Sequence, residues 1–428
     1  MLETGGKKCE IFYTAYTLDG KNTKERPITF AFNGGPGSAS MFLRIGCLGP
    51  RRIDVDENGR SKELPAKLSD NPNSLLDLTD LVIIDAVGTG YSRSLKNSPD
   101  PFIGYDSDAR TMGDFVRQYI SRKYVAGESY GTTRAVAVCS YLADACSLNL
   151  NGLILISAIN DFSTIHFSES NDVPYAAAIP TFAADAWFHG VLDPKYQDLE
   201  LEEYLAEVKT FVEKEYVPAL FQGSRLSEAD RKMIASSLAG YTGLSEEMIL
   251  SRNLRVTLDE FLTGLMKDRK LTVGRLDGRI AGPYTGESIG TGEDDPSSRE
   301  FNLMFGNAMN DCIINELNFK TDRPYIPQNQ EELAAWTFPG SAGDGYLSQE
   351  SVIRTCISKN TYLKVWVLGG YYDGATQFYA NEWTFGRVFL SEERKENVTF
   401  SYYPCGHMIC LEKESLDLFR RDAEAWFQ

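Results

Sequence analysis

Histidine and cysteine are both scarce in this sequence of 428 residues, and their scarcity limits the chemistry available to the chain. There are three histidines, at positions 166, 189 and 407, and eight cysteines, none of them spaced from the histidines as zinc ligands are. We therefore expect no bound metal and no other cofactor, and we expect the cysteines to be reduced thiols. A reaction that needs a histidine base has to use one of the three.

Long apolar runs and an excess of basic residues are also absent. No stretch reaches the roughly 18 apolar residues that cross a bilayer, so we expect no membrane insertion. The net charge of −17 argues against a nucleic-acid partner, because such proteins present basic faces to phosphate. Residues 1–8 are not followed by the apolar core of a signal peptide. This favours a cytoplasmic location, or a secreted or periplasmic one if a leader preceded these residues. The sequence gives no indication of the oligomeric state.

One short motif points to nucleophilic catalysis. Gly127–Gly131 has the form G-x-S-x-G, follows the aromatic and β-branched residues 123–125, and precedes a helical run over Thr132–Cys146. Its glycines permit the strained strand-to-helix turn that holds a serine hydroxyl above the edge of a sheet. The N-terminus of the helix then faces developing negative charge. This context makes Ser129 the candidate nucleophile.

The chain contains the same pattern a second time, at Gly286–Gly290. Residues 291–296, which follow it, comprise threonine, glycine, three acidic residues and a proline, so a helix is not expected directly after this serine. We therefore interpret Ser288 as a loop residue. The comparison shows that the context of the motif, rather than the motif itself, identifies the nucleophile.

The candidate base is His407. In the chain order serine, acid, histidine, the base follows the nucleophile and lies on a loop after a late strand. Residues 398–403 have the pattern of such a strand, a proline and a glycine break it before His407, and a helix is expected from about Glu414. We interpret His189 and His166 as packed or capping residues.

The candidate acid is Asp373. The apolar run Tyr362–Leu368 predicts a strand, and Asp373 lies shortly after its end. A carboxylate there would hold the tautomer of His407 and stabilise the imidazolium that forms when the serine loses its proton. The rival is Asp85, which also lies at a strand end but precedes the nucleophile, and for which we favour a structural role.

An oxyanion hole is expected at the glycine-rich loop Asn33–Ser38. This loop follows the predicted strand Pro27–Phe32, and its glycines allow the backbone to approach a ligand closely. It lacks the lysine and the Ser/Thr of a phosphate-binding loop. We expect the N–H groups of Gly35 and of Tyr130, the residue after the nucleophile, to form the hole.

These motifs together resemble the serine carboxypeptidase family, in their order as well as in their spacing. The similarity extends over about residues 25–425 and is closest to the bacterial branch, which the stretches 48–52 and 272–277 resemble. It implies cleavage of the C-terminal peptide bond through an acyl-enzyme, on an α/β-hydrolase fold with a helical cap inserted after the sixth core strand. The motifs that carry the resemblance are Asn33–Ser38, Asp85 with Val87–Ser92, Gly127–Gly131, Asp373 and Gly406–Met408.

The resemblance also implies how the terminal carboxylate of a substrate is bound. The family uses the asparagine and first glycine of an Asn-Gly-Gly motif and two glutamic acids that share a proton; Asn33, Gly34 and Glu128 match three of these positions. Cys47 occupies the fourth. A lone Glu128 donates a hydrogen bond to a carboxylate only while protonated, so we expect affinity to fall as the pH rises. Arg44 could add a counter-charge, although we favour a structural role for it.

Periodicity divides the chain into a core, an insertion and a second core segment. The apolar residues 152–157 predict a strand buried on both faces, and the apolar spacing over 201–212 predicts a helix. Ser227 and Thr257 have the pattern of helix starts, and Gly282–Ser298 has the composition of an exposed loop. With the resemblance, this predicts an α/β-hydrolase fold whose mostly parallel central sheet is flanked by helices. Its segments are a first core part at 1–160, a mainly helical cap at 161–355 and a second core part at 356–428.

The function predicted from the sequence is that of a serine-type carboxypeptidase acting on peptides. Ser129 attacks the scissile carbonyl, His407 moves the proton and Asp373 orients His407. Because an acyl-enzyme can pass its acyl group to another acceptor, an esterase or acyltransferase on the same scaffold is the alternative. A third hypothesis is that the protein binds a ligand without catalysing a reaction. The complete set of catalytic residues disfavours it.

Overall fold

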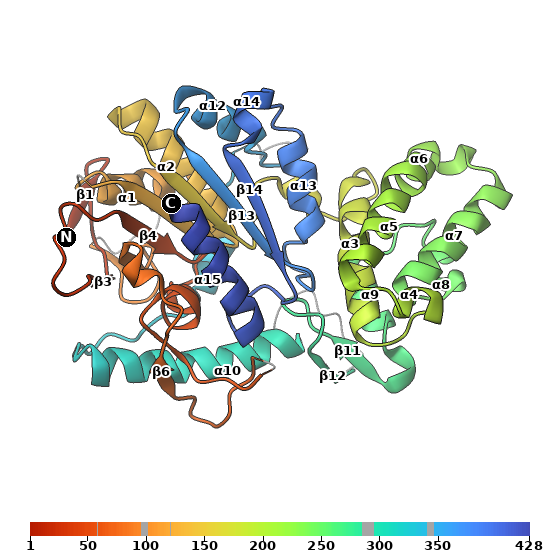
Figure 1. Cartoon of the computed structure of the whole chain (residues 1–428), viewed down its shortest axis with the longest axis horizontal. Helices are drawn as coiled ribbons and strands as arrows, with labels where there is room; N and C mark the ends of the chain where they lie inside the picture. The colour runs from red at the N-terminus through yellow and green to blue at the C-terminus, as the bar shows by residue number, and fades with distance from the viewer. Residues whose placement is uncertain (58, 96–101, 120, 285–294, 340–345) are drawn as a thin grey trace.

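A seven-stranded sheet forms the centre of the molecule (Figure 1). The computed structural model describes residues 1–428 except 58, 96–101, 120, 285–294 and 340–345. In order across the sheet, the strands are β14 (Val398–Tyr403), β13 (Lys364–Gly370), β10 (Gly152–Ile156), β9 (Lys123–Glu128), β4 (Ile28–Phe32), β7 (Asp80–Ile84) and β3 (Tyr13–Tyr16). All neighbours are parallel except β3, which runs antiparallel to β7 at one edge.

The central strands are buried along their whole length because both faces of the sheet are covered. Every residue of β4, β7, β9 and β10 is buried. The strands predicted at Pro27–Phe32, 152–157, Tyr362–Leu368 and 398–403 are confirmed. Since the strands are parallel, their carboxyl ends lie at the same edge of the sheet, and the segments that carry the candidate catalytic residues start there.

Helices pack against both faces of the sheet. On one face, α1 (Tyr105–Val116), α2 (Tyr130–Cys146) and α12 (Glu350–Lys359) share an apolar core with the strands. On the other face lies α15 (Lys413–Phe427), whose Phe419 stacks on Trp366 with ring centroids 5.6 Å apart (Figure 1). The helices predicted over Thr132–Cys146 and from about Glu414 are confirmed.

A helical lobe, which we call the cap, stands beside the sheet (Figure 1) and belongs to the segment between β10 and β13. It has its own apolar core, in which the rings of Phe182 and Phe261 stack 4.0 Å apart. The predicted helix starts are confirmed, because Ser227 caps one helix and Thr257 forms a capping box with Glu260. The helices of the cap are α3 (Val173–Phe188), α4 (Pro194–Gln197), α5 (Leu201–Phe211), α6 (Val217–Gln222), α7 (Glu228–Thr242), α8 (Glu246–Ser251) and α9 (Leu258–Gly264).

The rest of this segment returns to the core. After β11 (Leu271–Val273) and β12 (Ala281–Pro283), which form a hairpin, α10 (Pro296–Asp311) packs on η1 (Leu43–Leu48). The prediction of an exposed loop over Gly282–Ser298 is wrong at its end. Asp295 is fully buried and caps α10, accepting from the Ser297 N–H at 3.0 Å, since Asp followed by Pro favours a helix start. Ser288 and residues 293–294 lie outside the described residues.

Shorter elements complete the described part of the chain. Among its helices, none is both long and apolar enough to cross a membrane. The remaining strands are β1 (Leu2–Thr4), β2 (Lys7–Glu10) and β8 (Arg93–Ser94), which form one antiparallel sheet, and the pair β5 (Arg51–Ile53) and β6 (Leu68–Asp70). The remaining helices are α11 (Gln330–Ala335), α13 (Phe378–Gly386) and α14 (Glu392–Lys395), with short helical turns at Leu75–Asp77, Phe162–Thr164, Val212–Tyr216, Gly223–Arg225, Lys267–Arg269 and Cys312–Glu316.

Candidate active site

Ser129 lies at the turn between β9 and α2, as its sequence context predicted. Its backbone angles of φ 59° and ψ −129° are rare for a residue with a side chain, and its N–H donates to the Ile156 carbonyl at 3.0 Å. The turn requires glycine on both sides of Ser129, because a side chain at either position would clash with the backbone. A Cβ on Gly127 would lie 2.0 Å from the carbonyl oxygen of Gly131, and one on Gly131 would lie 2.6 Å from that of Phe32. The turn therefore presents a serine in a conformation that only this glycine pattern permits.

Asp373 and His407 are in contact in a buried site. His407 Nδ1 donates to Asp373 Oδ2 at 2.7 Å, and the same carboxylate accepts from the Ala375 N–H at 2.8 Å and the Thr376 N–H at 3.0 Å. The Thr376 hydroxyl donates to it at 2.7 Å. Burial by itself lowers the pKa of His407, but the charge and hydrogen bond of Asp373 outweigh it, so the pKa is raised. Asp373 thus holds the imidazole in the Nδ1–H tautomer.

The other ring nitrogen of His407 is available as a base. Within the described residues, the imidazole of His407 forms two hydrogen bonds, to Asp373 and to Thr376, and both are made through Nδ1. Among the hydrogen bonds of the described residues, none joins the Ser129 hydroxyl to Nε2. Catalytic hydrogen bonds of this kind often form only when substrate is bound. The arrangement leaves Nε2 free to accept the serine proton.

Asp85, the rival acid, is engaged elsewhere. Its Oδ1 accepts from the Ser40 N–H at 2.8 Å and lies 3.7 Å from Nη2 of Arg44. The side chains of Asp85 and Arg44 are both fully buried, and the Arg44 guanidinium lies over the ring of Phe12 at 5.3 Å. A buried ion pair of this kind has a structural role, which agrees with the interpretation of both residues from the sequence.

The glycine-rich loop and the start of α2 meet where an oxyanion hole is expected. A Cβ on Gly34 would lie 2.5 Å from the Tyr130 nitrogen and 2.7 Å from the Gly131 nitrogen. Gly35, with φ +98°, adopts a conformation that favours glycine. The N–H of Tyr130 lies in the first turn of α2, where no acceptor exists within the helix. The Gly34 backbone therefore lies directly against the amide of Tyr130, beside the nucleophile.

Glu128 is a buried carboxyl next to the nucleophile. Its Oε1 accepts from Asn33 Nδ2 at 2.8 Å, and Asn33 is fixed in turn by the Leu43 N–H, which donates to its Oδ1 at 3.1 Å. Burial raises the pKa of Glu128 to about 7, with the Asp373 carboxylate acting in the same direction and His407 and Asn33 opposing it. The residue is therefore a protonated donor in mildly acidic solution.

The expectation that every cysteine is reduced is wrong, because Cys47 and Cys410 form a disulfide with their Cα atoms 5.1 Å apart. These residues are 363 positions apart, and folding brings η1 against the loop that follows His407. No spacing pattern in the sequence could have paired them. The other six cysteines are free thiols.

The disulfide lines a small cavity beside Glu128. This cavity has a volume of about 10 Å³, and its wall includes Glu128, both bridged cysteines, Phe42 and Phe305. Cys47, at the position for which the resemblance implied a second glutamic acid, is therefore part of a disulfide. Glu128 has no carboxyl partner there.

Of the two remaining histidines, His189 is half-buried, as expected, whereas His166 is exposed, so the interpretation of His166 as a packed residue is wrong. The imidazole of His189 donates from Nε2 to the Gly278 carbonyl at 2.7 Å. The ring of His166 lies edge-on to that of Tyr346, with centroids 5.1 Å apart. Neither has a contact with Ser129 or Asp373 among the described residues.

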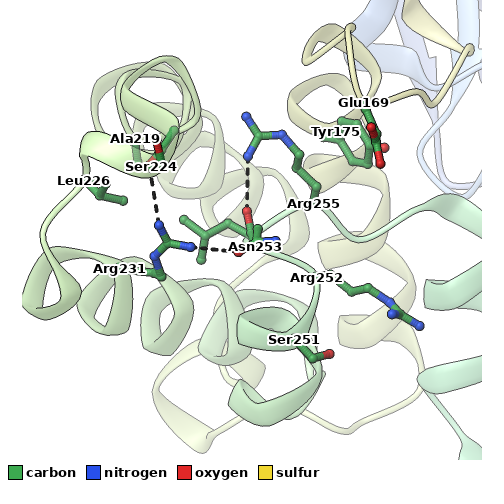
Figure 2. A pocket seen from close by; sticks show the side chains of 12 residues that line it. Glu169, Tyr175, Ala219, Ser224, Leu226, Arg231, Ser251, Arg252, Asn253 and Arg255 are labelled. Atoms are coloured by element: carbon green, nitrogen blue, oxygen red, sulfur yellow. Dashed lines mark hydrogen bonds between the residues drawn. The ribbon is translucent and has the colours of Figure 1, made fainter.

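A separate pocket of about 490 Å³ lies in the cap (Figure 2). Three arginines line it, Arg231, Arg252 and Arg255, and none of the candidate catalytic residues does. Arg255 forms a bidentate ion pair with Asp172, at 2.7 and 2.9 Å, and donates to the Asn253 carbonyl at 3.2 Å. The guanidinium of Arg255 therefore stabilises the cap through contacts within it.

Part of the chain is similar in sequence to known serine carboxypeptidases. Residues 3–210 match the serine carboxypeptidase family model. Serine carboxypeptidase-like 33 of Arabidopsis thaliana is 29% identical over 168 residues, which are 35% of this chain and 34% of that protein. The pheromone-processing carboxypeptidase KEX1 of Yarrowia lipolytica is 31% identical over 160 residues, 36% of this chain and 24% of that protein. The matches thus span between a quarter and a third of these relatives.

A solved structure extends the comparison to the whole chain. The crystal structure of Kex1(delta)p, a prohormone-processing carboxypeptidase from Saccharomyces cerevisiae, superposes with a TM-score of 0.58 at 15% identity. The superposition covers 99% of this chain and 87% of that one, so the two proteins share a fold. The predicted α/β fold, with its mostly parallel sheet flanked by helices, is confirmed. Residues 3–210 thus match the model of the serine carboxypeptidase family, and the chain has the α/β-hydrolase fold.

Proposed function

We propose that this protein is a serine carboxypeptidase that removes the C-terminal residue of peptides through an acyl-enzyme on Ser129. The observation that carries the proposal is the buried Glu128 carboxyl, which directly precedes Ser129 and contacts Asn33. A carboxyl that keeps its proton close to the nucleophile can donate a hydrogen bond to the terminal carboxylate of a peptide. The His407–Asp373 pair provides the base for the same reaction.

In the proposed reaction, the Ser129 hydroxyl attacks the scissile carbonyl carbon while His407 Nε2 accepts its proton. Asp373 stabilises the imidazolium that results. The N–H groups of Gly35 and Tyr130 donate to the oxyanion of the tetrahedral intermediate. The intermediate collapses when the leaving amine takes the proton from His407. Water then attacks the acyl-enzyme with His407 again as the base, which releases the shortened peptide.

Recognition of the substrate terminus depends on one carboxyl in this proposal. Glu128 donates to the terminal carboxylate while protonated, and Asn33 and the Gly34 N–H add further donors. The Cys47–Cys410 disulfide supplies no proton, so Glu128 keeps its own through burial and not by sharing with a second acid. The charged groups that face Glu128 are His407 and Asp373, and their effects on its pKa oppose each other.

The pH dependence of KM tests this recognition. For a blocked dipeptide with a free C-terminus, we expect KM to be nearly constant below pH 7 and to rise by about tenfold per pH unit well above it, as Glu128, with a pKa of about 7, ionises and repels the carboxylate. For the corresponding dipeptide amide we expect a higher KM at low pH and no rise of KM with pH. The measurement is kcat and KM between pH 5 and 9 for both substrates.

The matched control is Glu128→Gln, which keeps a donor at every pH. In this variant KM for the free acid should be flat across the range, because no group titrates at that position. If the wild type had equal kcat and KM values for the free acid and the amide at all pH values, the carboxypeptidase assignment would be contradicted. That result, together with turnover of simple esters, would support the alternative of a general acyl hydrolase on the same scaffold.

The disulfide also bears on the compartment. Structural disulfides persist in oxidising compartments and are rare in the reducing cytosol. We therefore propose that the protein works outside the cytosol, although the residues at its N-terminus favoured a cytoplasmic location. When the source cells are lysed in denaturant with an alkylating reagent and no reductant, we expect six cysteines to be alkylated and Cys47 and Cys410 to be protected. Alkylation of all eight cysteines would contradict both the disulfide and the compartment.

A further inference from the structure

The loop between β11 and β12 holds the two loops that carry the catalytic acid and base. The His407 N–H donates to the Leu276 carbonyl at 2.6 Å, and the Gly278 N–H donates to the carbonyl of Tyr372, next to Asp373, at 2.9 Å. The approach is close, because a Cβ on Gly406 would lie 2.5 Å from the Leu276 carbonyl oxygen. This loop, residues 274–280, therefore contacts His407 and the residue that precedes Asp373 through the backbone.

Arg279 of this loop ties together the segments on both sides of His407. Its Nη1 donates to the Pro404 carbonyl at 2.8 Å and to Glu412 Oε2 at 2.7 Å. Its Nε and Nη2 donate to the two oxygens of Asp277 at 2.9 and 2.6 Å. Pro404 precedes His407 by three residues and Glu412 follows it by five. One guanidinium thus fixes the start of the His407 loop, its end, and the loop that supports it.

The Arg279 side chain is well packed where it makes these bonds. It is 13% exposed, and its guanidinium lies 4.9 Å from the ring centroid of Tyr372. Both carboxylates that it neutralises are also nearly buried, with side-chain exposures of 9% for Asp277 and 13% for Glu412. A lysine could not replace it, since an ammonium lacks the planar fork that reaches a carbonyl and two carboxylates at once.

The cap contacts the same loop through α3. His189, at the end of α3, donates to the Gly278 carbonyl at 2.7 Å. The carboxyl of Asp185, one helical turn earlier, occupies the space beside Gly278, where a Cβ would lie 2.0 Å from Asp185 Oδ1. Burial raises the pKa of Asp185 well above its usual range, the nearby Asp277 carboxylate raises it further, and Arg279 acts in the opposite direction.

We infer that Arg279 is a positioning residue for His407, and that loop 274–280 is the link through which the cap sets the catalytic base against Asp373. Without the guanidinium, the Asp277 and Glu412 carboxylates lose the cation that joins them, and the His407 loop loses its tether at Pro404. Movement of this loop would lengthen the bond from His407 to Asp373. A displacement of about 1 Å at a reacting group lowers the rate by about 100-fold.

The test compares Arg279→Met and Arg279→Lys with Arg255→Met. The last is the matched control, because Arg255 also forms a bidentate ion pair but does so within the cap, with Asp172 (Figure 2 shows Arg255). The first readout is the NMR titration of the imidazoles, which is simple to assign because the chain has three histidines. The charged groups that face His407 are Asp373, Glu128 and Arg275. Because Asp373 raises the pKa of His407, loosening this pair should lower that pKa.

We expect Arg279→Met to lower the pKa of His407 and to reduce kcat by about 10- to 100-fold with KM changed by less than about threefold. Arg279→Lys should have a smaller effect in the same direction, and it provides the result if the methionine variant does not fold. Arg255→Met should lower the Tm and leave both readouts as in the wild type.

An unchanged His407 titration and kcat in a folded Arg279 variant would overturn the inference, and so would an equal shift in Arg255→Met. The turnover part of the test depends on the proposed function, whereas the NMR titration does not. A wild type that fails to cleave peptides would therefore refute the function and still leave the positioning role of Arg279 open to measurement.

Discussion

Replacing Ser129 by alanine is expected to lower kcat for peptide hydrolysis by roughly a millionfold, to the residual rate that binding and the oxyanion hole sustain. The variant should fold normally. Alanine keeps the Cβ, so the strain at φ 59° and ψ −129° is the same as in the wild type, and the buried N–H bond to Ile156 is retained. The measurements are kcat with a blocked dipeptide and covalent labelling by a fluorophosphonate, which should also be lost.

The matched control is Ser288→Ala, which alters the same pentapeptide pattern in the second copy. It should leave both hydrolysis and labelling unchanged. Turnover near the wild-type rate in Ser129→Ala would refute the proposed mechanism. Failure of the fluorophosphonate to label the wild type would instead favour a catalytically silent binding protein.

Asp373→Asn is expected to lower kcat by about 10⁴-fold while the fold is retained. The reason lies in the donors around the carboxylate. Oδ1 accepts from two backbone N–H groups, those of Ala375 and Thr376, so the oxygen of the new amide must take that side. Its NH₂ group then faces His407, whose Nδ1 cannot remain a donor. The imidazole changes to the Nε2–H tautomer and can no longer accept the proton of Ser129.

The control for this prediction is Asp85→Asn, at the other buried aspartate that lies at a strand end. It removes a charge from the pair with Arg44 and should lower the Tm, with kcat changed by less than about tenfold in the folded protein. Circular dichroism establishes that the compared samples are equally folded. The opposite pattern, with Asp85→Asn inactive and Asp373→Asn active, would show that the acid has been assigned to the wrong residue.

Local sequence determined most of the core and the surroundings of the nucleophile. The strands at Pro27–Phe32 and 152–157 could be predicted because a strand buried on both faces needs a continuous apolar run. The turn at Ser129 could be predicted because its glycines, strand and helix all lie within a short segment. The ends of predicted strands also placed Asp373 and His407 correctly enough for their contact to be anticipated.

Contacts between distant segments were decided by the tertiary structure alone. Cys47 and Cys410 meet only because η1 and the loop after His407 pack together, and residue spacing carries no record of that packing. The bonds of Arg279 to Pro404 and Glu412 arise in the same way. The raised pKa of Glu128 depends on how completely the fold removes it from water. The sequence determined which groups could react, and packing over long separations determined their partners and their protonation.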